Sequence, residues 1–267
     1  MAVRRENKMN KLKFEVHICE HCNLNCKGCY HFSPLAKEEF LDVNEWNKDC
    51  KRLSELFNGE MEFISLMGGE PLLHPKICEL IEITRRNFKV GDVSIITNGT
   101  LLLDMNEEFW KTCRDNNVTI RQTKYPLEID FEAIEKKVKK EKVNFVYFNV
   151  GVKSLGYQPL ELTATQPALE NFNNCYRVNS CIAFSHGKLY TCFIPAHVHH
   201  LKDYFKLNIE IDKNDGVDIY KVKSADEIRE LLNKPLSMCR YCRRDIATRE
   251  GIKWDISNKE ISEWVKL

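Results

Sequence analysis

The sequence predicts an α/β fold in which a mostly parallel sheet is covered by helices. Apolar runs of period two alternate with amphipathic stretches of helical period over residues 12–150, which is the first observation behind this prediction. The second is that the connections are short, because strands that alternate with helices in this way pair in parallel. About five such units are present, too few for a full eight-stranded barrel.

The first two units follow from residue patterns and capping signals. The first strand is predicted over residues 12–18, where apolar and polar residues alternate. Asp42, with a glutamate three positions later, predicts the start of the first helix. The second strand covers residues 61–66, and the next helix begins near Pro75, a favourable first helical position.

The later elements continue the alternation up to about residue 155. They are predicted, in order, as a strand at 93–97, a helix opened by Asp104, a strand at 118–122, a helix at 130–140 and a strand at 143–150. Residues 182–193 are then interpreted as a hairpin around His186-Gly187, and residues 225–232 as a helix.

Composition excludes several classes of protein. The chain has 267 residues and a formal net charge of +1, with no basic field that would indicate nucleic acid as a partner. It shows no signal peptide and no run of eighteen apolar residues. We therefore expect a cytoplasmic protein without a membrane or nucleic-acid partner. In that reducing compartment, clustered thiols bind metal or catalyse rather than form disulfides.

The twelve cysteines are unevenly distributed, which suggests two metal sites. One group lies near the N-terminus and comprises Cys19, Cys22, Cys26 and Cys29. The other comprises Cys175, Cys181, Cys192, Cys239 and Cys242. Three isolated cysteines fall on the apolar stripes of predicted helices and are interpreted as core residues: Cys50, Cys78 and Cys113.

Cys22, Cys26 and Cys29 have C-x3-C-x2-C spacing directly after the first predicted strand. Three thiolates can hold three irons of a [4Fe-4S] cluster and leave the fourth iron open, whereas an electron-transfer ferredoxin usually closes all four corners. Two alternatives are a zinc site completed by His21 or His31, and buried thiols that happen to be neighbours.

A second motif, Gly68-Gly69-Glu70-Pro71, follows the second predicted strand and would by itself indicate only a turn. With the cysteine motif and Tyr30 directly after it, this sequence resembles the radical S-adenosylmethionine (radical SAM) superfamily. The resemblance implies that the open iron is chelated by the amino and carboxylate groups of S-adenosylmethionine.

The resemblance also implies contacts to S-adenosylmethionine. Tyr30 is expected near the adenine. Gly68 and Gly69 would present main-chain carbonyls to the methionine ammonium, with Glu70 as a nearby charge partner. Asn98, at the end of the third predicted strand, could reach the nucleoside or serve as a turn residue.

The second cysteine group has the pattern Cys175-x11-Gly187-x4-Cys192 followed by Cys239-x2-Cys242. It resembles the twitch or SPASM auxiliary-cluster domain and fits the shorter twitch form with one cluster. The four named cysteines are the expected ligands of a second [4Fe-4S] cluster. A structural zinc site is the alternative.

Cys181 is left over in this region. It could replace Cys175 as a ligand, be a core thiol, or donate a hydrogen atom to a substrate radical in an epimerisation. Three histidines after the hairpin are interpreted as loop residues lining the active site, since no carboxylate or cysteine stands at metal-ligand spacing from them: His197, His199 and His200. Trp254 and Trp264 are interpreted as packing anchors.

The implied architecture is a partial (β/α)6-type barrel at residues 12–165 followed by a small twitch-like domain at residues 166–247. Residues 1–11 are expected to form a flexible tail, and residues 248–267 a tail packed on the barrel.

The implied activity is that of a radical SAM oxidoreductase. One electron splits S-adenosylmethionine, the resulting 5′-deoxyadenosyl radical takes a C–H hydrogen, a base removes a proton, and the auxiliary cluster accepts the remaining electron. We expect the first electron to come from a flavodoxin- or ferredoxin-type reductant.

The substrate class is expected from size. Short twitch enzymes include aminocyclitol dehydrogenases, while peptide-modifying relatives often carry an N-terminal recognition domain. About eleven residues precede the first strand, which favours a small sugar- or cyclitol-like substrate that is dehydrogenated or epimerised. A peptide-modifying enzyme is the first alternative. A non-catalytic zinc or iron–sulfur binding protein is the second.

Overall fold

The computed structural model describes residues 12–149, 154–178, 180 and 182–266. Within these residues, eight strands form one sheet in the order β5-β4-β3-β2-β1-β7-β8-β9. Their bounds are β1 (Lys13–Cys19), β2 (Glu60–Gly68), β3 (Val90–Thr97), β4 (Val118–Thr123), β5 (Asn144–Asn149), β7 (Ala183–Ser185), β8 (Lys188–Tyr190) and β9 (Val217–Asp218). All pairings from β5 to β7 are parallel, which confirms the predicted parallel sheet.

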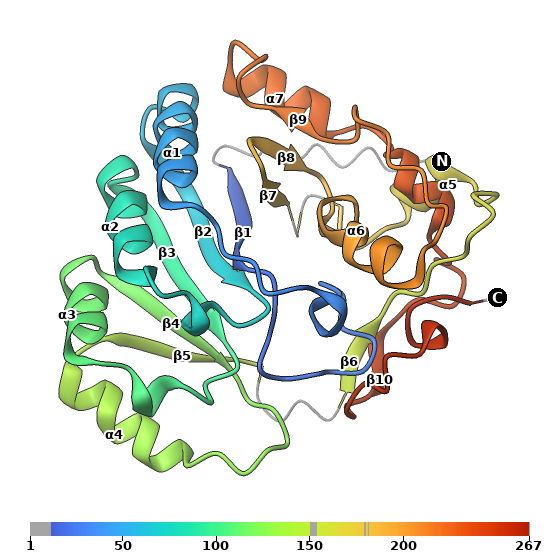
Figure 1. The fold of residues 1–267 in the computed structure, drawn as a ribbon. Helices are drawn as coiled ribbons and strands as arrows, with labels where there is room; N and C mark the ends of the chain where they lie inside the picture. The colour runs from blue at the N-terminus through green and yellow to red at the C-terminus, as the bar shows by residue number, and fades with distance from the viewer. Residues whose placement is uncertain (1–11, 150–153, 179, 181, 267) are drawn as a thin grey trace.

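Four helices connect the first five strands and lie along one face of the sheet (Figure 1). They are α1 (Val43–Phe57), α2 (Ile77–Asn87), α3 (Glu107–Asp115) and α4 (Phe131–Glu141). Asp42 caps α1 as predicted, because its carboxylate accepts from the amides of Asn44 and Glu45. The third helix begins three residues later than Asp104, after a 3-10 turn, with Asn106 as its cap.

The main hydrophobic core fills the space between this sheet and its helices. Apolar side chains of β1 alternate inward, and fully buried partners such as Trp46 and Leu53 face them from α1. Cys50 and Cys113 are also fully buried, which confirms their interpretation as core residues.

The predicted hairpin forms β7 and β8, with His186 and Gly187 at positive φ in its turn. It joins the main sheet, because Ala183 pairs in parallel with Glu15 of β1. Strand β7 is thus a sixth parallel strand among the described residues, and the architecture is a partial (β/α) barrel.

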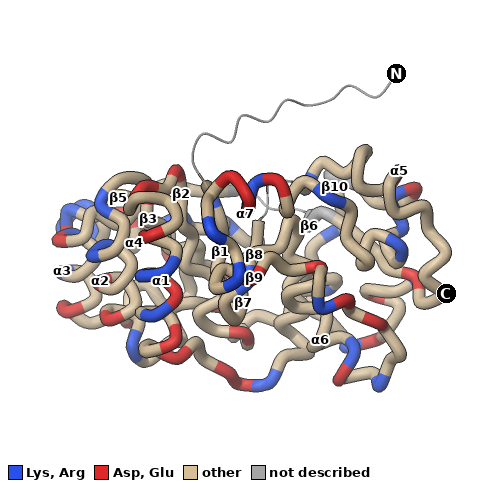
Figure 2. The backbone as a smooth tube through the Cα atoms, turned by 90° about the horizontal axis from the view of Figure 1, so that it is seen from above, with Lys and Arg blue, Asp and Glu red and all other residues tan. Residues whose placement is uncertain are grey.

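The remaining elements lie on the side of β1 where β7 pairs, away from β2 to β5 (Figure 1). They are β6 (Ser154–Tyr157), α5 (Ala168–Asn173), α6 (Phe193–Phe205), α7 (Ala225–Leu232) and β10 (Thr248–Lys253), with β6 and β10 forming a separate antiparallel ribbon. A second core packs around α6 and includes Leu201 and Trp264. Charged residues of both signs are spread over most of the molecule (Figure 2). Among the described helices, none has the length and apolar character needed to cross a membrane.

Candidate active site

The three cysteines of the first motif lie in one loop, residues 20–30, at the carboxyl end of β1 (Figure 1). We call this the cysteine loop. A tight turn, in which the Cys29 amide donates to the Cys26 carbonyl at 3.2 Å, brings these residues together. Gly28 has a φ of 63° within that turn, which glycine adopts without strain. The predicted placement at a strand end is confirmed.

The environment of the thiols suits iron–sulfur ligands. The Leu24 amide donates to Cys22 Sγ at 3.3 Å, and Trp254 Nε1 donates to Cys26 Sγ at 3.3 Å. Hydrogen bonds to sulfur are among the features that tune such clusters. Burial, together with the neighbouring Cys29, raises the pKa of Cys26 to about 12, so that metal binding must displace a proton from this thiol.

The three thiols of the loop do not crowd around a single-ion position. A tetrahedral zinc ion with bonds of 2.3 Å needs sulfur atoms about 3.8 Å apart. Among the described residues, the groups of three candidate ligand atoms that lie within 4.8 Å of one another contain histidines and a glutamate but no cysteine. The assignment of a four-iron cluster rather than one zinc ion to this loop stays a prediction.

Residues 254–265, which we call the C-terminal segment, pair with the cysteine loop. The Lys27 amide donates to the Asp255 carbonyl at 2.9 Å, and the Ser257 amide donates to the Asn25 carbonyl at 2.7 Å. Trp264, which is 3% exposed, donates from Nε1 to the Cys29 carbonyl at 2.9 Å. Trp264 is a packing anchor as expected, and its indole also fixes the loop.

Replacing Trp264 with phenylalanine should destabilise the protein and loosen this loop. The Cys29 carbonyl would lose one of its two donors and keep the Phe32 amide at 3.1 Å, which costs about 0.5–1.5 kcal/mol of unfolding free energy. Urea unfolding and iron loading measure the two effects. Trp46→Phe is the matched control, because it removes a hydrogen bond to Thr84 at 2.9 Å in the other core. Equal iron loading in both variants would contradict the role assigned to Trp264.

Because Gly68 and Gly69 have no side chains, the backbone at the end of β2 packs directly against the backbone of Cys19 and His21. A Cβ at Gly68 would lie 2.1 Å from the Cys19 carbonyl oxygen, and one at Gly69 would lie 2.0 Å from that of His21. The Gly69 amide donates to the Cys19 carbonyl at 2.7 Å. These glycines therefore serve a contact between two backbones. Their carbonyl contacts to S-adenosylmethionine stay a prediction.

Glu70 joins the ends of β2 and β3. It is fully buried, and its carboxylate accepts from Thr97 Oγ1 at 2.6 Å, the Asn98 amide at 2.9 Å and the Leu72 amide at 3.1 Å. Burial raises the pKa of Glu70 to about 7, although these three hydrogen bonds oppose the shift. Pro71 directly follows as the first residue of a short 3-10 helix. A charge-partner role for Glu70 stays a prediction.

Asn98 connects the end of β3 to the cysteine loop. Its Nδ2 donates to Asn23 Oδ1 at 2.8 Å, and its Oδ1 accepts from the Thr100 amide at 2.9 Å. Asn23 in turn donates to Thr100 Oγ1 at 2.8 Å. The three motifs that sequence placed at strand ends thus meet at one edge of the sheet. Nucleoside binding by Asn98 stays a prediction.

Tyr30 lies on the side of the cysteine loop that faces the second cysteine group. The Arg177 guanidinium stands 3.9 Å from the centre of its ring, and the Phe193 ring centre is 5.6 Å away. Its expected place near an adenine stays a prediction.

Four cysteines of the second group line a single cavity of about 380 Å³, measured with its open mouth: Cys175, Cys192, Cys239 and Cys242. Cys192 is the N-cap of α6, and Asn171 Nδ2 donates at 2.8 Å to the carbonyls of both Cys239 and Cys242. Burial raises the pKa of Cys239 to about 11. Burial raises the pKa of Cys242 as well, and two arginines that line the cavity, Arg177 and Arg244, partly offset this shift. Cys181 lies outside the described residues.

The interpretation of His197, His199 and His200 as loop residues is wrong, because all three lie in α6. Apolar residues at helical spacing bury one face of this helix: Phe193, Ile194, Val198 and Leu201. The missing carboxylate is Glu20, which lies 180 positions before His200 and 2.8 Å from its Nε2. No local spacing rule could have paired them.

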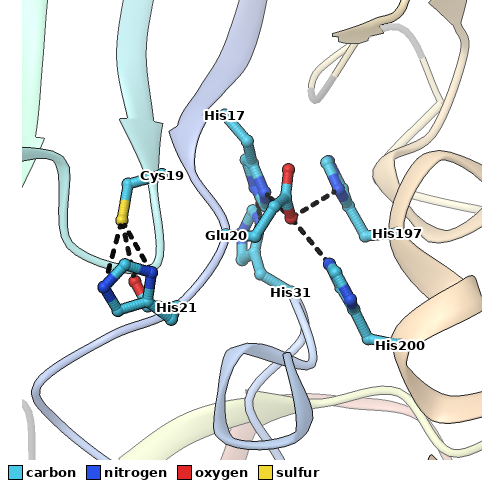
Figure 3. A network of polar contacts seen from close by, with 7 residues as sticks. All are labelled: His17, Cys19, Glu20, His21, His31, His197 and His200. Atoms are coloured by element: carbon cyan, nitrogen blue, oxygen red, sulfur yellow. Dashed lines mark hydrogen bonds and ion pairs between the residues drawn. The ribbon is translucent and has the colours of Figure 1, made fainter. Parts of the chain in front are cut away.

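Glu20 is the centre of what we call the histidine cluster: His17, Glu20, His31, His197 and His200 (Figure 3). The Glu20 Oε2 atom lies 3.0 Å from His17 Nδ1 and 3.4 Å from His197 Nδ1. The His17 and His197 rings stack with their centres 3.5 Å apart. Burial and His17 lower the pKa of His197 to about 3, which keeps this imidazole neutral.

Comparison with known proteins adds a family match. Residues 16–142 match the family described as "Radical SAM superfamily". A GTP 3′,8-cyclase of Clostridium botulinum is 25% identical over 270 residues, covering 94% of this chain and 82% of that protein. A probable GTP 3′,8-cyclase of Methanothermobacter marburgensis is 31% identical over 107 residues, covering 40% of this chain and 33% of that protein.

A solved structure shares the fold over most of the chain. BtrN in complex with AdoMet and 2-DOIA aligns with a TM-score of 0.54 at 15% identity, covering 90% of this chain and 96% of that one. At this identity the likeness concerns the fold alone.

Proposed function

This chain is a member of the radical SAM superfamily, and we propose that it abstracts hydrogen from a C–H bond of a small sugar- or cyclitol-like substrate. Membership implies S-adenosylmethionine and one [4Fe-4S] cluster as cofactors. The observation that carries the proposal is the convergence of the cysteine loop, Gly68–Pro71 and Asn98 at the carboxyl ends of β1, β2 and β3.

Cys22, Cys26 and Cys29 would hold the cluster of this site. When bound, such a cluster supplies the electron that cleaves S-adenosylmethionine and so begins hydrogen abstraction. The chain's own residues prepare the site. The C-terminal segment lies over the loop through Asp255 and Ser257 and helps to exclude water.

The four cysteines around the second cavity are proposed to hold a second [4Fe-4S] cluster that accepts the electron released on substrate oxidation. This proposal is supported by the single cavity that all four cysteines line. Arg177 and Arg244 beside it would offset the negative charge of a cluster ligated by four thiolates. With all four corners closed, this site would transfer electrons without binding S-adenosylmethionine.

Replacing Cys239 with alanine should lower the iron content from about eight to about four atoms per chain. The cysteine loop would keep its cluster, so reduced protein should still cleave S-adenosylmethionine, while substrate oxidation is lost. Iron analysis and chromatography of 5′-deoxyadenosine measure these outcomes. Cys113→Ala is the control, because that thiol is buried in the main core. Four irons in the unmodified protein would refute the second cluster.

The substrate class is supported by relatives that act on small molecules. The C. botulinum relative that aligns along most of this chain is named for the cyclisation of GTP, a small molecule. A reduced, iron-loaded preparation should be incubated with carbon-deuterated aminocyclitols and sugars.

We expect deuterium in 5′-deoxyadenosine when the right compound is present. An oxidised product would indicate dehydrogenation, and a retained formula with inverted configuration would indicate epimerisation. Deuterium transfer from peptides alone would overturn the proposed substrate class. Failure of the iron-loaded protein to cleave S-adenosylmethionine would overturn the proposed hydrogen abstraction.

A further inference from the structure

The histidine cluster lies outside the residues proposed to hold either iron–sulfur cluster, and its donor atoms suit a different ion. We propose that Glu20, His197 and His200 bind one zinc ion. His197 and His200 are three positions apart in α6, so both side chains lie on the same face of the helix (Figure 3). Glu20 reaches that face from the cysteine loop.

The distances between the donor atoms are already close to those expected around a zinc ion. His200 Nε2 and His197 Nδ1 lie 2.8 and 3.4 Å from Glu20 Oε2. Three such atoms around a tetrahedral zinc ion, with bonds of about 2.0–2.1 Å, would stand about 3.3 Å apart. One carboxylate and two imidazoles, with one position left for water or another oxygen ligand, are the ligand set of several catalytic zinc sites.

His197 supplies an independent indication of a missing ligand. Its side chain is 1% exposed, yet neither ring nitrogen makes a hydrogen bond of good geometry with the described residues. A buried polar group without a partner costs about 1–3 kcal/mol, and a metal bond would remove this cost. His197 is aimed at Glu20, as Figure 3 shows.

His17 and His31 surround the proposed ligands and are placed to orient them. His17 Nδ1 contacts Glu20 at 3.0 Å, and His17 Nε2 contacts His31 Nδ1 at 2.5 Å. Imidazoles and carboxylates that hydrogen-bond to metal ligands fix their orientation. His17 and His31 would therefore hold Glu20 in place rather than bind the ion.

A cavity open to solvent borders Glu20, one of the three proposed ligands. Glu20 and His17 line a cavity of about 520 Å³, a volume that includes its opening to solvent. Three further carboxylates line the same cavity: Glu39, Asp42 and Glu45. Their negative charge would raise the local concentration of a divalent cation.

The test uses the anaerobically reconstituted full chain, equilibrated with zinc and then desalted. We expect one zinc per chain in addition to the iron. X-ray absorption at the zinc edge should show only nitrogen and oxygen ligands, at about 2.0–2.1 Å from the zinc. A sulfur shell at about 2.3 Å would place the zinc at the cysteines and overturn the proposal. So would the absence of bound zinc.

Variants then locate the ion. His200→Ala and Glu20→Gln should lose the zinc, and His17→Ala should weaken binding about 10- to 100-fold, as expected for an outer partner. His199→Ala, a half-buried neighbour on the same helix, should retain it. Iron content and circular dichroism show whether each variant is folded. Zinc retained by both folded His200→Ala and Glu20→Gln would refute the site.

Discussion

Replacement of Cys26 with alanine is expected to reduce S-adenosylmethionine cleavage to the rate without enzyme. Cys26 is one of three thiols in the cysteine loop, and the fourth thiol of the group, Cys19, belongs to β1 and contacts His21 Nδ1 at 3.3 Å. A cluster held by two cysteines would be lost or opened further. Anaerobic assays of 5′-deoxyadenosine formation measure the result.

The same preparation separates the two proposed clusters. Cys26→Ala should retain about four irons per chain if the second cavity holds its own cluster. Cys78→Ala is the control, since this half-buried thiol lies in α2. Normal cleavage by the Cys26 variant would contradict the assignment of the cysteine loop.

Gly68→Ala should be strongly destabilising at the end of β2. Gly68 has a φ of 137°, and an added Cβ would lie 2.1 Å from the Cys19 carbonyl oxygen. Strained backbone and overpacking each cost about 1–3 kcal/mol, so the expected loss of unfolding free energy is about 2–6 kcal/mol. Relief of the clash would displace the start of the cysteine loop, and iron loading should fall with stability.

Gly59→Ala provides the matched control for urea unfolding and iron analysis. Gly59 has a φ of 69°, but its Cβ would lie 3.4 Å from the nearest atom, the Asn87 carbonyl oxygen. This variant therefore carries backbone strain of about 1–2 kcal/mol without the overlap. Equal losses in the two variants would show that the approach of β2 to Cys19 is not what requires glycine at position 68.

Local periodicity was sufficient to predict the part of the main sheet from β1 to β5. The alternation of strands and helices from β1 to β5 could be predicted because the apolar side chains of each element must face one core. Asp42 could be predicted as the cap of α1 because the amides that it accepts from are at most three residues away. The start of α3 was misplaced because a 3-10 turn at Asp104 carries the same acidic signal as a helix N-terminus. The position of β7 in the main sheet could not be predicted, because a strand of three residues is too short to show an alternating pattern.

The candidate site was predictable only where its residues are close in sequence. Cys22, Cys26 and Cys29 share one loop, so spacing alone indicated their chemistry. The pairing of Glu20 with α6 depends on tertiary packing across 180 positions. For Gly68 and Gly69, the resemblance implied contacts to a ligand, but only the fold reveals that the backbones of Cys19 and His21 approach them.

The pairing of the C-terminal segment with the cysteine loop sets an order of events during synthesis. Trp254 follows Cys26 by 228 positions, so at about 5–20 residues per second the ribosome delivers the loop about 10–45 s before its partner. Throughout that interval the thiols lack the strand-like cover that residues 255–257 later supply. Iron delivered before residues 254–257 have been synthesised would meet an incomplete site, and lasting insertion should follow their synthesis.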